Sequence, residues 1–188
     1  MKKIIVSLAL TLAVAFTATA EPAKALKVGD AAPTFKIKDT TGKQINLKKL
    51  TAKGPVLVRL TCGCLGCDRE LPYFQALHKA YKKDGIRLVA VFAEPDEKFA
   101  KYVKTKKLNM QYALDPKKNS WQVFGTKTMP SNFLIEKGGK VAAISKGCDP
   151  SGLIARNLGD KAATLVKTAK VDIKAQVDKN KKPVTPKK

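Results

Sequence analysis

The sequence predicts an α/β fold in which a central mixed β-sheet is flanked by helices. Apolar runs typical of buried strands alternate with helical segments through the middle of the chain, and two more strands and a helix follow. The 188 residues suit one domain, and a hydrophobic content of 44% is enough to build a core. We therefore expect one folded domain between two less regular ends.

The first twenty residues are expected to be a secretory signal peptide. Two lysines precede an uncharged, mainly apolar run at residues 4–16, and the sequence ATA at residues 18–20 offers a cleavage site. The run is too short to span a bilayer as a helix, which favours cleavage after Ala20 over an uncleaved membrane tether. Export would place the protein in a periplasm or outside the cell, where cysteines pair or are redox-active.

The folded part is expected to begin, after a lead-in at residues 21–26, with a β-hairpin. Residues 35–37 and 44–47 flank the turn sequence DTTG. Pro55 then opens an apolar run that fits a buried strand, interrupted only by Arg59. In residues 65–83 apolar side chains recur at steps of three and four, which predicts a helix with one buried face. These side chains are Cys67, Leu71, Phe74, Leu77 and Tyr81.

The rest of the domain continues the alternation of strands and helices. Strands are predicted at residues 86–93, 111–114, 132–135 and 141–145, and helices at 96–106 and around 121–124. A closing helix is expected to begin near Pro150, with Asp149 as its cap. The domain then spans residues 27–160. A lysine-rich extension occupies residues 161–188, and we expect it to be disordered from about residue 178.

The charge of the chain is strongly positive, with a formal net charge of +22. Nearly all of it comes from lysines scattered through every segment, whereas nucleic-acid readers usually concentrate arginines and aromatic residues on one face. We therefore expect no nucleic-acid partner. The pattern favours a solvated surface with a weak attraction to acidic partners or anionic lipid, on a protein that we expect to be a monomer.

The cysteine pair Cys64 and Cys67, in the sequence CLGC, lies where a buried strand hands over to an amphipathic helix. Free N–H groups in the first turn of a helix favour a thiolate, and a cysteine three residues on can close a small disulfide ring. We interpret Cys64 as the attacking thiol and Cys67 as the thiol that resolves the mixed disulfide. Zinc would need a second ligand pair at suitable spacing, which the chain lacks, so we expect neither a metal nor a cofactor.

Two other residues are candidates for this site. Glu70 falls three residues after Cys67 on the same predicted helix, where a carboxylate can approach the pair and govern proton transfer. Pro130 immediately precedes a predicted strand, where a cis proline can hold backbone groups against the cysteines.

The order of these motifs resembles the TlpA/ResA-like family of exported thioredoxins, within the redoxin (AhpC/TSA) superfamily. The resemblance rests on PVLV, CLGCDRELP and TMPSNFLIEKGGKV, and the segment VGDAAPTFKIKDTTGKQINL is similar to an extra N-terminal hairpin of that family. It implies a thioredoxin fold and thiol–disulfide exchange. It also implies Cys64 as nucleophile, Cys67 as resolving thiol, Glu70 as active-site carboxylate and Pro130 as cis proline. Implied partners are protein thiols and disulfides, such as apocytochrome c, other exported proteins or copper-site chaperones, and a membrane or soluble redox donor.

The approach to the first cysteine departs from the family pattern. The family commonly has a WATWC-like sequence, where this chain has LTCGC, with Gly63 in place of the tryptophan. Cys62 and Cys148 are additional thiols, and the thioredoxin pattern places Cys148 in a loop that borders the cysteine site. They can form a structural disulfide, serve as a second redox couple or remain unpaired. We predict a Cys62–Cys148 disulfide.

Two other functions remain open from the sequence. Thr61 and Cys64 match the end of the PxxxTxxC pattern of peroxiredoxins, although Pro55 lies two residues too early. A peroxidase would use Cys64 as its peroxidatic cysteine. The cluster CGCLGC can alternatively provide soft ligands to a non-catalytic copper- or haem-related thiol chaperone.

Overall fold

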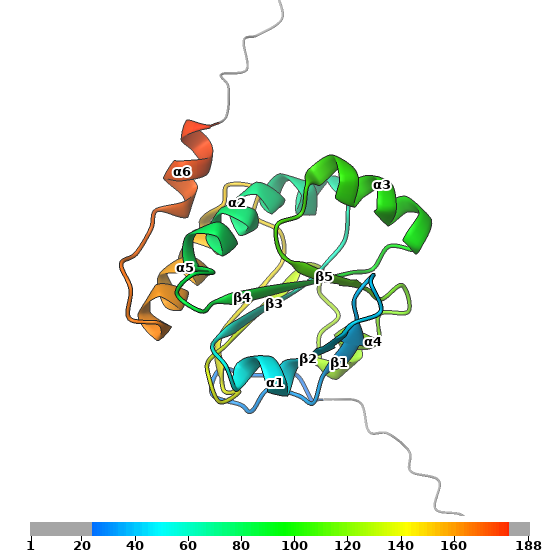
Figure 1. Cartoon of the computed structure of the whole chain (residues 1–188), viewed down its shortest axis with the longest axis horizontal. Coiled ribbons are helices and arrows are strands. Elements are labelled where there is room, and N and C mark those ends of the chain that lie inside the picture. Colours follow the sequence, from blue (N-terminus) through cyan, green and yellow to red (C-terminus); the bar gives the residue numbers. More distant parts are fainter. Residues whose placement is uncertain (1–23, 181–188) are drawn as a thin grey trace, which may run out of the picture.

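The computed structural model describes residues 24–180, so the expected signal peptide and residues 181–188 lie outside it. Five strands form one mixed sheet in the order β5-β4-β3-β6-β7, and β1 and β2 form a separate antiparallel pair (Figure 1). The strands are β1 Lys36–Lys38, β2 Gln44–Asn46, β3 Val56–Thr61, β4 Arg87–Phe92, β5 Gln111–Leu114, β6 Ser131–Ile135 and β7 Val141–Lys146. The helices are α1 Leu47–Thr51, α2 Leu65–Tyr81, α3 Asp96–Lys106, α4 Asn119–Val123, α5 Leu153–Leu165 and α6 Ile173–Lys179. The predicted α/β architecture and N-terminal hairpin are confirmed.

Strand β3 lies at the centre of the five-stranded sheet. It pairs in parallel with β4 and antiparallel with β6, and all six of its residues are buried. Its side chains alternate between two hydrophobic clusters, so that Leu57 faces one layer while Val56 and Val58 face the other. A strand that is buried on both faces has a nearly continuous apolar sequence, which explains the apolar run from which β3 was predicted.

The two faces of the sheet are covered by different elements. Helices α2, α3, α5 and α6 lie on one side, and the β1–β2 hairpin, α1 and α4 lie on the other (Figure 1). The apolar positions predicted for the helix at residues 65–83 form the buried face of α2, with Phe74 and Leu77 fully buried. No helix among residues 24–180 is long and apolar enough to cross a membrane.

Two local expectations differ from the structure. The segment predicted to continue as a strand through Leu47 instead turns into the short helix α1, because the Asn46 side chain accepts a hydrogen bond from the Lys49 N–H and caps it.

Helix α5 begins at Leu153 rather than near Pro150. The Asp149 carboxylate accepts hydrogen bonds from the N–H groups of Ser151 and Leu153, and Gly152 adopts φ 85° at the cap position. Asp149 therefore binds the first helical N–H from outside the helix.

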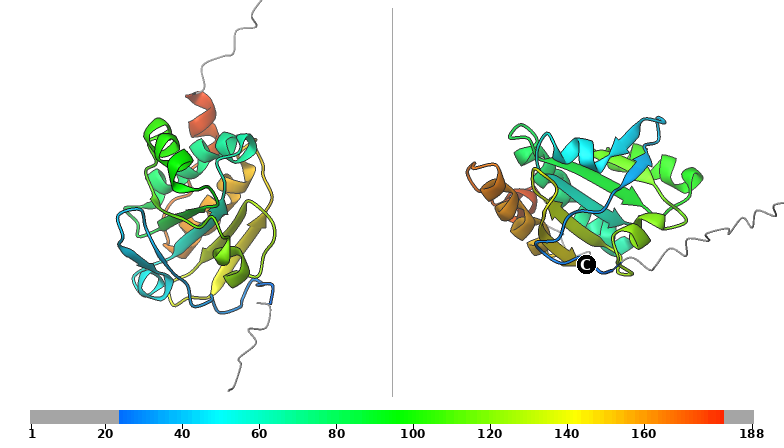
Figure 2. Two further views of the ribbon diagram at one scale, coloured as in Figure 1. Left: turned by 90° about the vertical axis from the view of Figure 1, so that its right-hand side faces the viewer. Right: turned by 90° about the horizontal axis from the view of Figure 1, so that it is seen from below.

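The lysine-rich extension continues the fold beyond residue 160. The expected boundary falls inside α5, and α6 packs beside α2 and α5 (Figures 1 and 2). The Tyr73 hydroxyl donates to the Asp178 carboxylate at 2.7 Å, and the Val171 N–H donates to the Tyr81 hydroxyl. Two tyrosines of α2 thus hold a segment whose sequence alone shows little apolar periodicity.

Candidate active site

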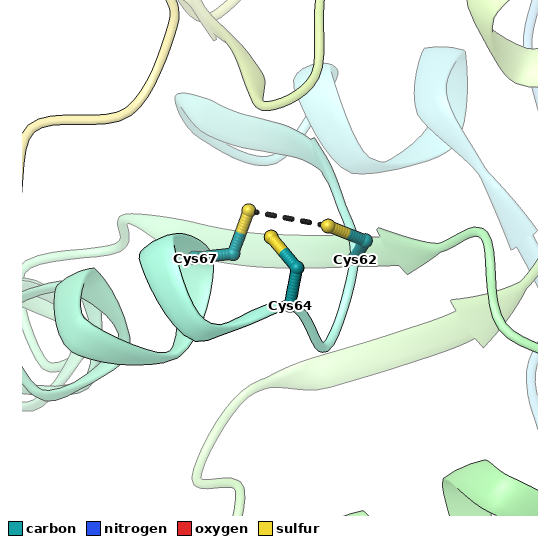
Figure 3. Close-up of side chains that lie close together, drawn as sticks. All are labelled: Cys62, Cys64 and Cys67. Carbon is teal, nitrogen blue, oxygen red and sulfur yellow. Dashed lines mark hydrogen bonds between the residues drawn. The ribbon is translucent and has the colours of Figure 1, made fainter.

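Three cysteines gather where β3 ends and α2 begins. Cys62 and Cys64 lie on the segment between these elements, and Cys67 lies in the first turn of α2 (Figure 3). The three sulfur atoms all lie within 4.8 Å of one another, and the sulfurs of Cys62 and Cys67 are in hydrogen-bond contact at 3.4 Å. The predicted pair Cys64 and Cys67 is therefore brought together, and a third thiol is added to it.

Cys64 occupies the N-cap position of α2 and is exposed to solvent. Desolvation by its surroundings works to raise the pKa of the Cys64 thiol. Hydrogen bonds from the Cys62 thiol and from the N–H and thiol of Cys67 outweigh it, with a further one from the Gly66 N–H, and the net pKa is lowered. The Cys62 thiol makes the largest of these contributions, and the N–H groups at the helix start add to it.

Cys62 and Cys67 occupy the inner side of the cluster. The Cys67 side chain is only 3% exposed, and Cys62 is partly buried. Burial is the main reason that the pKa of Cys62 is raised, and the Cys64 thiol, which accepts a hydrogen bond from it, adds to the effect. The cluster therefore contains one accessible thiol that ionises easily and an inner thiol, Cys62, whose ionisation is disfavoured.

Glu70 takes part in a buried ion pair that sequence reasoning missed. Its Oε2 atom accepts a hydrogen bond from the Arg59 guanidinium at 2.8 Å, and both side chains are almost fully buried. Arg59 also donates to the Asn132 side chain on β6 and lies over the Phe74 ring. The one available signal was the charge of Arg59 within an apolar strand, which requires a buried partner.

The other carboxylate oxygen of Glu70 reaches the loop that carries Cys148. It accepts a hydrogen bond from the Asp149 N–H at 2.9 Å. The pKa of the Cys148 thiol is raised to about 11, first by burial and then by the negative charge of Glu70. Glu70 thus links α2 to β3 on one side and to residues 148–149 on the other.

The predicted Cys62–Cys148 disulfide concerns the oxidised protein and stays a prediction, because all four cysteines are free thiols in this structure. The sulfur that contacts Cys62 here belongs to Cys67. Cys148 instead lies against Gly66, whose missing side chain leaves room for its sulfur: a Cβ at that position would meet the sulfur at 3.0 Å. Cys62 follows β3 directly, and its sulfur faces that of Cys67 in the first turn of α2.

Pro130 lies at the same end of the sheet as the thiols. The Met129–Pro130 peptide bond is cis. Ser131 pairs with Leu60 in the antiparallel register, so Pro130 is next to the end of β3. Its carbonyl accepts a hydrogen bond from the Gly147 N–H, which brings the loop with Cys148 to the same place.

A groove of about 440 Å³ opens beside the exposed thiol. It is lined by Gly63, Cys64, Ala93, Glu94, Pro95 and Tyr102. Glu94 Oε1 accepts a hydrogen bond from the Gly63 N–H at 2.6 Å and so fixes the backbone next to the nucleophile. Its buried Oε2 atom has no hydrogen-bond partner within residues 24–180. Neither Glu94 nor Tyr102 carries a signal in a single sequence.

The three-thiol group has two chemical capabilities. An exposed thiol of lowered pKa beside a buried thiol can carry out disulfide exchange. Three sulfurs within 4.8 Å can also hold a soft ion such as Cu(I), for which thiolates are preferred ligands.

Comparisons with known proteins agree with the first capability. The model of the AhpC/TSA family matches residues 28–144. The thiol-disulfide oxidoreductase ResA of Bacillus thuringiensis subsp. konkukian is 34% identical over 123 residues, which cover 65% of this chain and 71% of that protein. ResA of Geobacillus kaustophilus is 31% identical over 135 residues, covering 71% and 78% of the two chains.

A solved structure shares the fold as well. The crystal structure of a putative thiol:disulfide interchange protein DsbE from Chlorobium tepidum superposes with a TM-score of 0.68 at 26% identity. The match covers 76% of this chain and 99% of that one.

Proposed function

Because the chain belongs to the AhpC/TSA family and is a thioredoxin-fold thiol–disulfide oxidoreductase, we propose roles for its two CLGC cysteines. Cys64 is the nucleophile, and Cys67 is the resolving thiol. One observation carries the assignment. Cys64 is exposed at the start of α2 with a lowered pKa, whereas Cys67 is buried one turn further on. Only the exposed thiolate can reach a disulfide in another protein.

The reaction then runs in two exchange steps. The Cys64 thiolate attacks one sulfur of the partner's disulfide, a mixed disulfide forms, and the other partner sulfur leaves as a thiolate. The leaving thiolate takes up the proton of Cys67. The Cys67 thiolate attacks the Cys64 sulfur, which closes the Cys64–Cys67 disulfide and releases the second partner thiolate. Two electrons pass to the partner, and a redox donor returns the enzyme to its dithiol form.

The buried residues around the thiols are proposed to act by positioning. Glu70 holds Arg59 and the Asp149 backbone, and thereby fixes α2 against β3 and against the loop with Cys148. Pro130 is proposed to present the backbone beside the end of β3 to the partner chain. The groove at Cys64 would accept an extended segment of the partner chain.

The substrates are proposed to be exported proteins with disulfides, such as apocytochrome c. The sequence of residues 1–20 has the composition of a secretory signal, which supports action in a periplasm or outside the cell. A surface rich in lysine would favour acidic partners. The redox donor is proposed to be a membrane-bound or soluble thiol protein.

Reduction of insulin by dithiothreitol tests this function. The wild-type protein should accelerate the precipitation of the insulin B chain, and Cys64→Ser should abolish the effect because the attacking thiolate is lost. Cys148→Ser, which removes an exposed thiol outside the three-thiol group, is the matched control and should remain active. Consumption of hydrogen peroxide or tight binding of Cu(I) by a protein that does not reduce insulin would reject the proposal.

A further inference from the structure

The sulfurs of Cys62 and Cys67 are in contact at 3.4 Å. We propose that Cys62 is a second disulfide partner of Cys67, and that this exchange of partners gives the oxidised protein a disulfide isomerase activity. The inference rests on the proposed function of Cys64 and Cys67 as the redox pair. It adds a third catalytic thiol and a second reaction.

The geometry allows Cys67 to bond with either neighbour. All three sulfurs point toward one another, and in this view the Cys64 sulfur is drawn between those of Cys67 and Cys62 (Figure 3). A Cys62–Cys67 bond requires that the separation of the two sulfurs shorten from 3.4 Å to the covalent distance of about 2 Å. Rotations of two side chains can supply such a shift because Cys62 lies on a loop and is only partly buried.

The exchange is an isomerisation within the protein and needs no oxidant. Starting from the Cys64–Cys67 disulfide, the Cys62 thiol loses its proton to solvent and attacks the Cys67 sulfur. The Cys62–Cys67 bond forms, the Cys64–Cys67 bond breaks, and Cys64 leaves as a thiolate. The centre stays at the oxidation level of one disulfide, but its accessible thiol has become free.

The environments of the three cysteines favour this direction of exchange. A thiol of low pKa is the better leaving group and is the more stable as a free thiolate, whereas a thiol that resists ionisation loses less by entering a disulfide. After the exchange the N–H groups of Cys67 and Gly66 still donate to the Cys64 thiolate, whereas burial disfavours the Cys62 thiolate. The bond should therefore move inward to Cys62 and Cys67.

This change of disulfide changes the reaction from reduction of a partner's disulfide to its rearrangement. With Cys67 held by Cys62, the free Cys64 thiolate can still attack a wrong disulfide in a partner protein. No resolving thiol is then available, so the mixed disulfide lasts until a thiol of the partner itself attacks it. The partner's disulfide is rearranged, Cys64 is released, and no electrons are transferred.

Locating the disulfide in the oxidised protein tests the pairing directly. The reduced protein is oxidised with one equivalent of diamide and quenched in acid. Free thiols are labelled with N-ethylmaleimide, and after reduction the released thiols are labelled with iodoacetamide. Trypsin cleavage after Arg59 and Arg69 leaves all three cysteines in one peptide, so fragment spectra must assign each label.

We expect the maleimide on Cys64 and iodoacetamide on Cys62 and Cys67 in a substantial fraction of wild-type molecules. In Cys64→Ser, a Cys62–Cys67 disulfide should form in nearly all molecules. Maleimide on Cys62 in practically all wild-type molecules, together with no Cys62–Cys67 bond in Cys64→Ser, would overturn the inference. A bond between Cys62 and Cys148 would overturn it equally.

Activity gives an independent readout. Refolding of scrambled ribonuclease by the oxidised protein reports isomerisation, and insulin turnover reports reduction. In Cys62→Ser the ratio of isomerase to reductase activity should fall roughly tenfold or more, because the serine keeps a donor toward Cys64 but cannot bond to Cys67. Cys148→Ser controls for the loss of one thiol and should keep the wild-type ratio. An equal ratio in all three proteins would contradict the inference.

These readouts separate the inference from the proposed function. A Cys64–Cys67 bond alone, with normal insulin reduction, would overturn the role of Cys62 and keep the proposed function. A Cys62–Cys67 bond in a protein that reduces no insulin would overturn the proposed function and keep the pairing.

Discussion

The Arg59 guanidinium on β3 and the Glu70 carboxylate on α2 form an ion pair of 2.8 Å with both side chains almost fully buried. The pair joins the strand and the helix that flank the three thiols. Arg59 is further held by Asn132 and Phe74, and Glu70 by the Asp149 N–H, so the charges are well compensated. A buried charge pair of this kind is sensitive to the loss of one member.

Replacement of Glu70 by alanine should destabilise the protein strongly. It leaves the Arg59 guanidinium buried without a counter-charge, which costs about 3 to 5 kcal/mol of unfolding free energy. Urea denaturation of the reduced protein measures the loss. The control is a double-mutant cycle, in which Arg59→Met/Glu70→Leu should lose less unfolding free energy than the sum of the losses in Arg59→Met and Glu70→Leu. Additive losses would mean that the two side chains do not interact.

The loop between Cys148 and α5 depends on a glycine. Gly152 has φ 85°, and a Cβ there would lie 2.4 Å from the Tyr73 ring. Gly152→Ala should therefore be destabilising through both backbone strain and a collision in the core. Gly138→Ala is matched because its φ is 95° with no atom within 4 Å of the added Cβ, so only strain of about 1 to 2 kcal/mol applies. Equal losses in urea denaturation would show that Tyr73 does not restrict this position.

The reactivity of Cys64 should persist to lower pH than that of Cys148. Hydrogen bonds outweigh desolvation and lower the pKa of Cys64, whereas burial and nearby negative charge raise the pKa of Cys148 to about 11. A lowered pKa means that the thiolate survives further into acid. The pH at which the alkylation rate of Cys64 is half-maximal should therefore lie well below the corresponding pH for Cys148. Iodoacetamide labelling of the reduced protein at a series of pH values measures both.

Removal of the donor at position 62 should move this midpoint. Cys62→Ala deletes a thiol that donates to the Cys64 thiolate, so the pKa of Cys64 should rise. Cys62→Ser keeps a donor and should restore part of the shift. A midpoint at Cys64 that equals that of Cys148, or that does not respond to Cys62→Ala, would contradict the description of the thiolate.

The strands of the main sheet and most of the helices could be predicted from the spacing of apolar residues, because this spacing determines which face of each element is buried. Strand β5 and helix α3 have the predicted bounds. Helix α6 was not predicted, because its position depends on two tyrosine hydroxyls of α2 that lie far away in the chain. Likewise α1 depends on a single side-chain cap at Asn46.

The candidate site was predictable where chemistry follows from local spacing. The CLGC motif at a strand–helix junction indicated Cys64 and Cys67, and the structure places them within reach of each other. The contact of Cys62 with Cys67 was not predicted, because the turn after β3 decides which way Cys62 faces and no sequence pattern reports that turn. The ion pair of Glu70 with Arg59 required the register of a helix against a strand, which is a tertiary property.

The central claim, that Cys64 attacks and Cys67 resolves, is tested most directly by trapping. Two double variants, Cys62→Ser/Cys67→Ser and Cys62→Ser/Cys64→Ser, each leave one member of the pair and no third thiol in the cluster. Both are incubated with insulin, quenched in acid with N-ethylmaleimide and run on non-reducing gels with mass spectrometry of any adduct. The account predicts a stable mixed disulfide through Cys64 in the first variant and none in the second. Equal adducts from both variants, or an adduct through Cys67 alone, would contradict it.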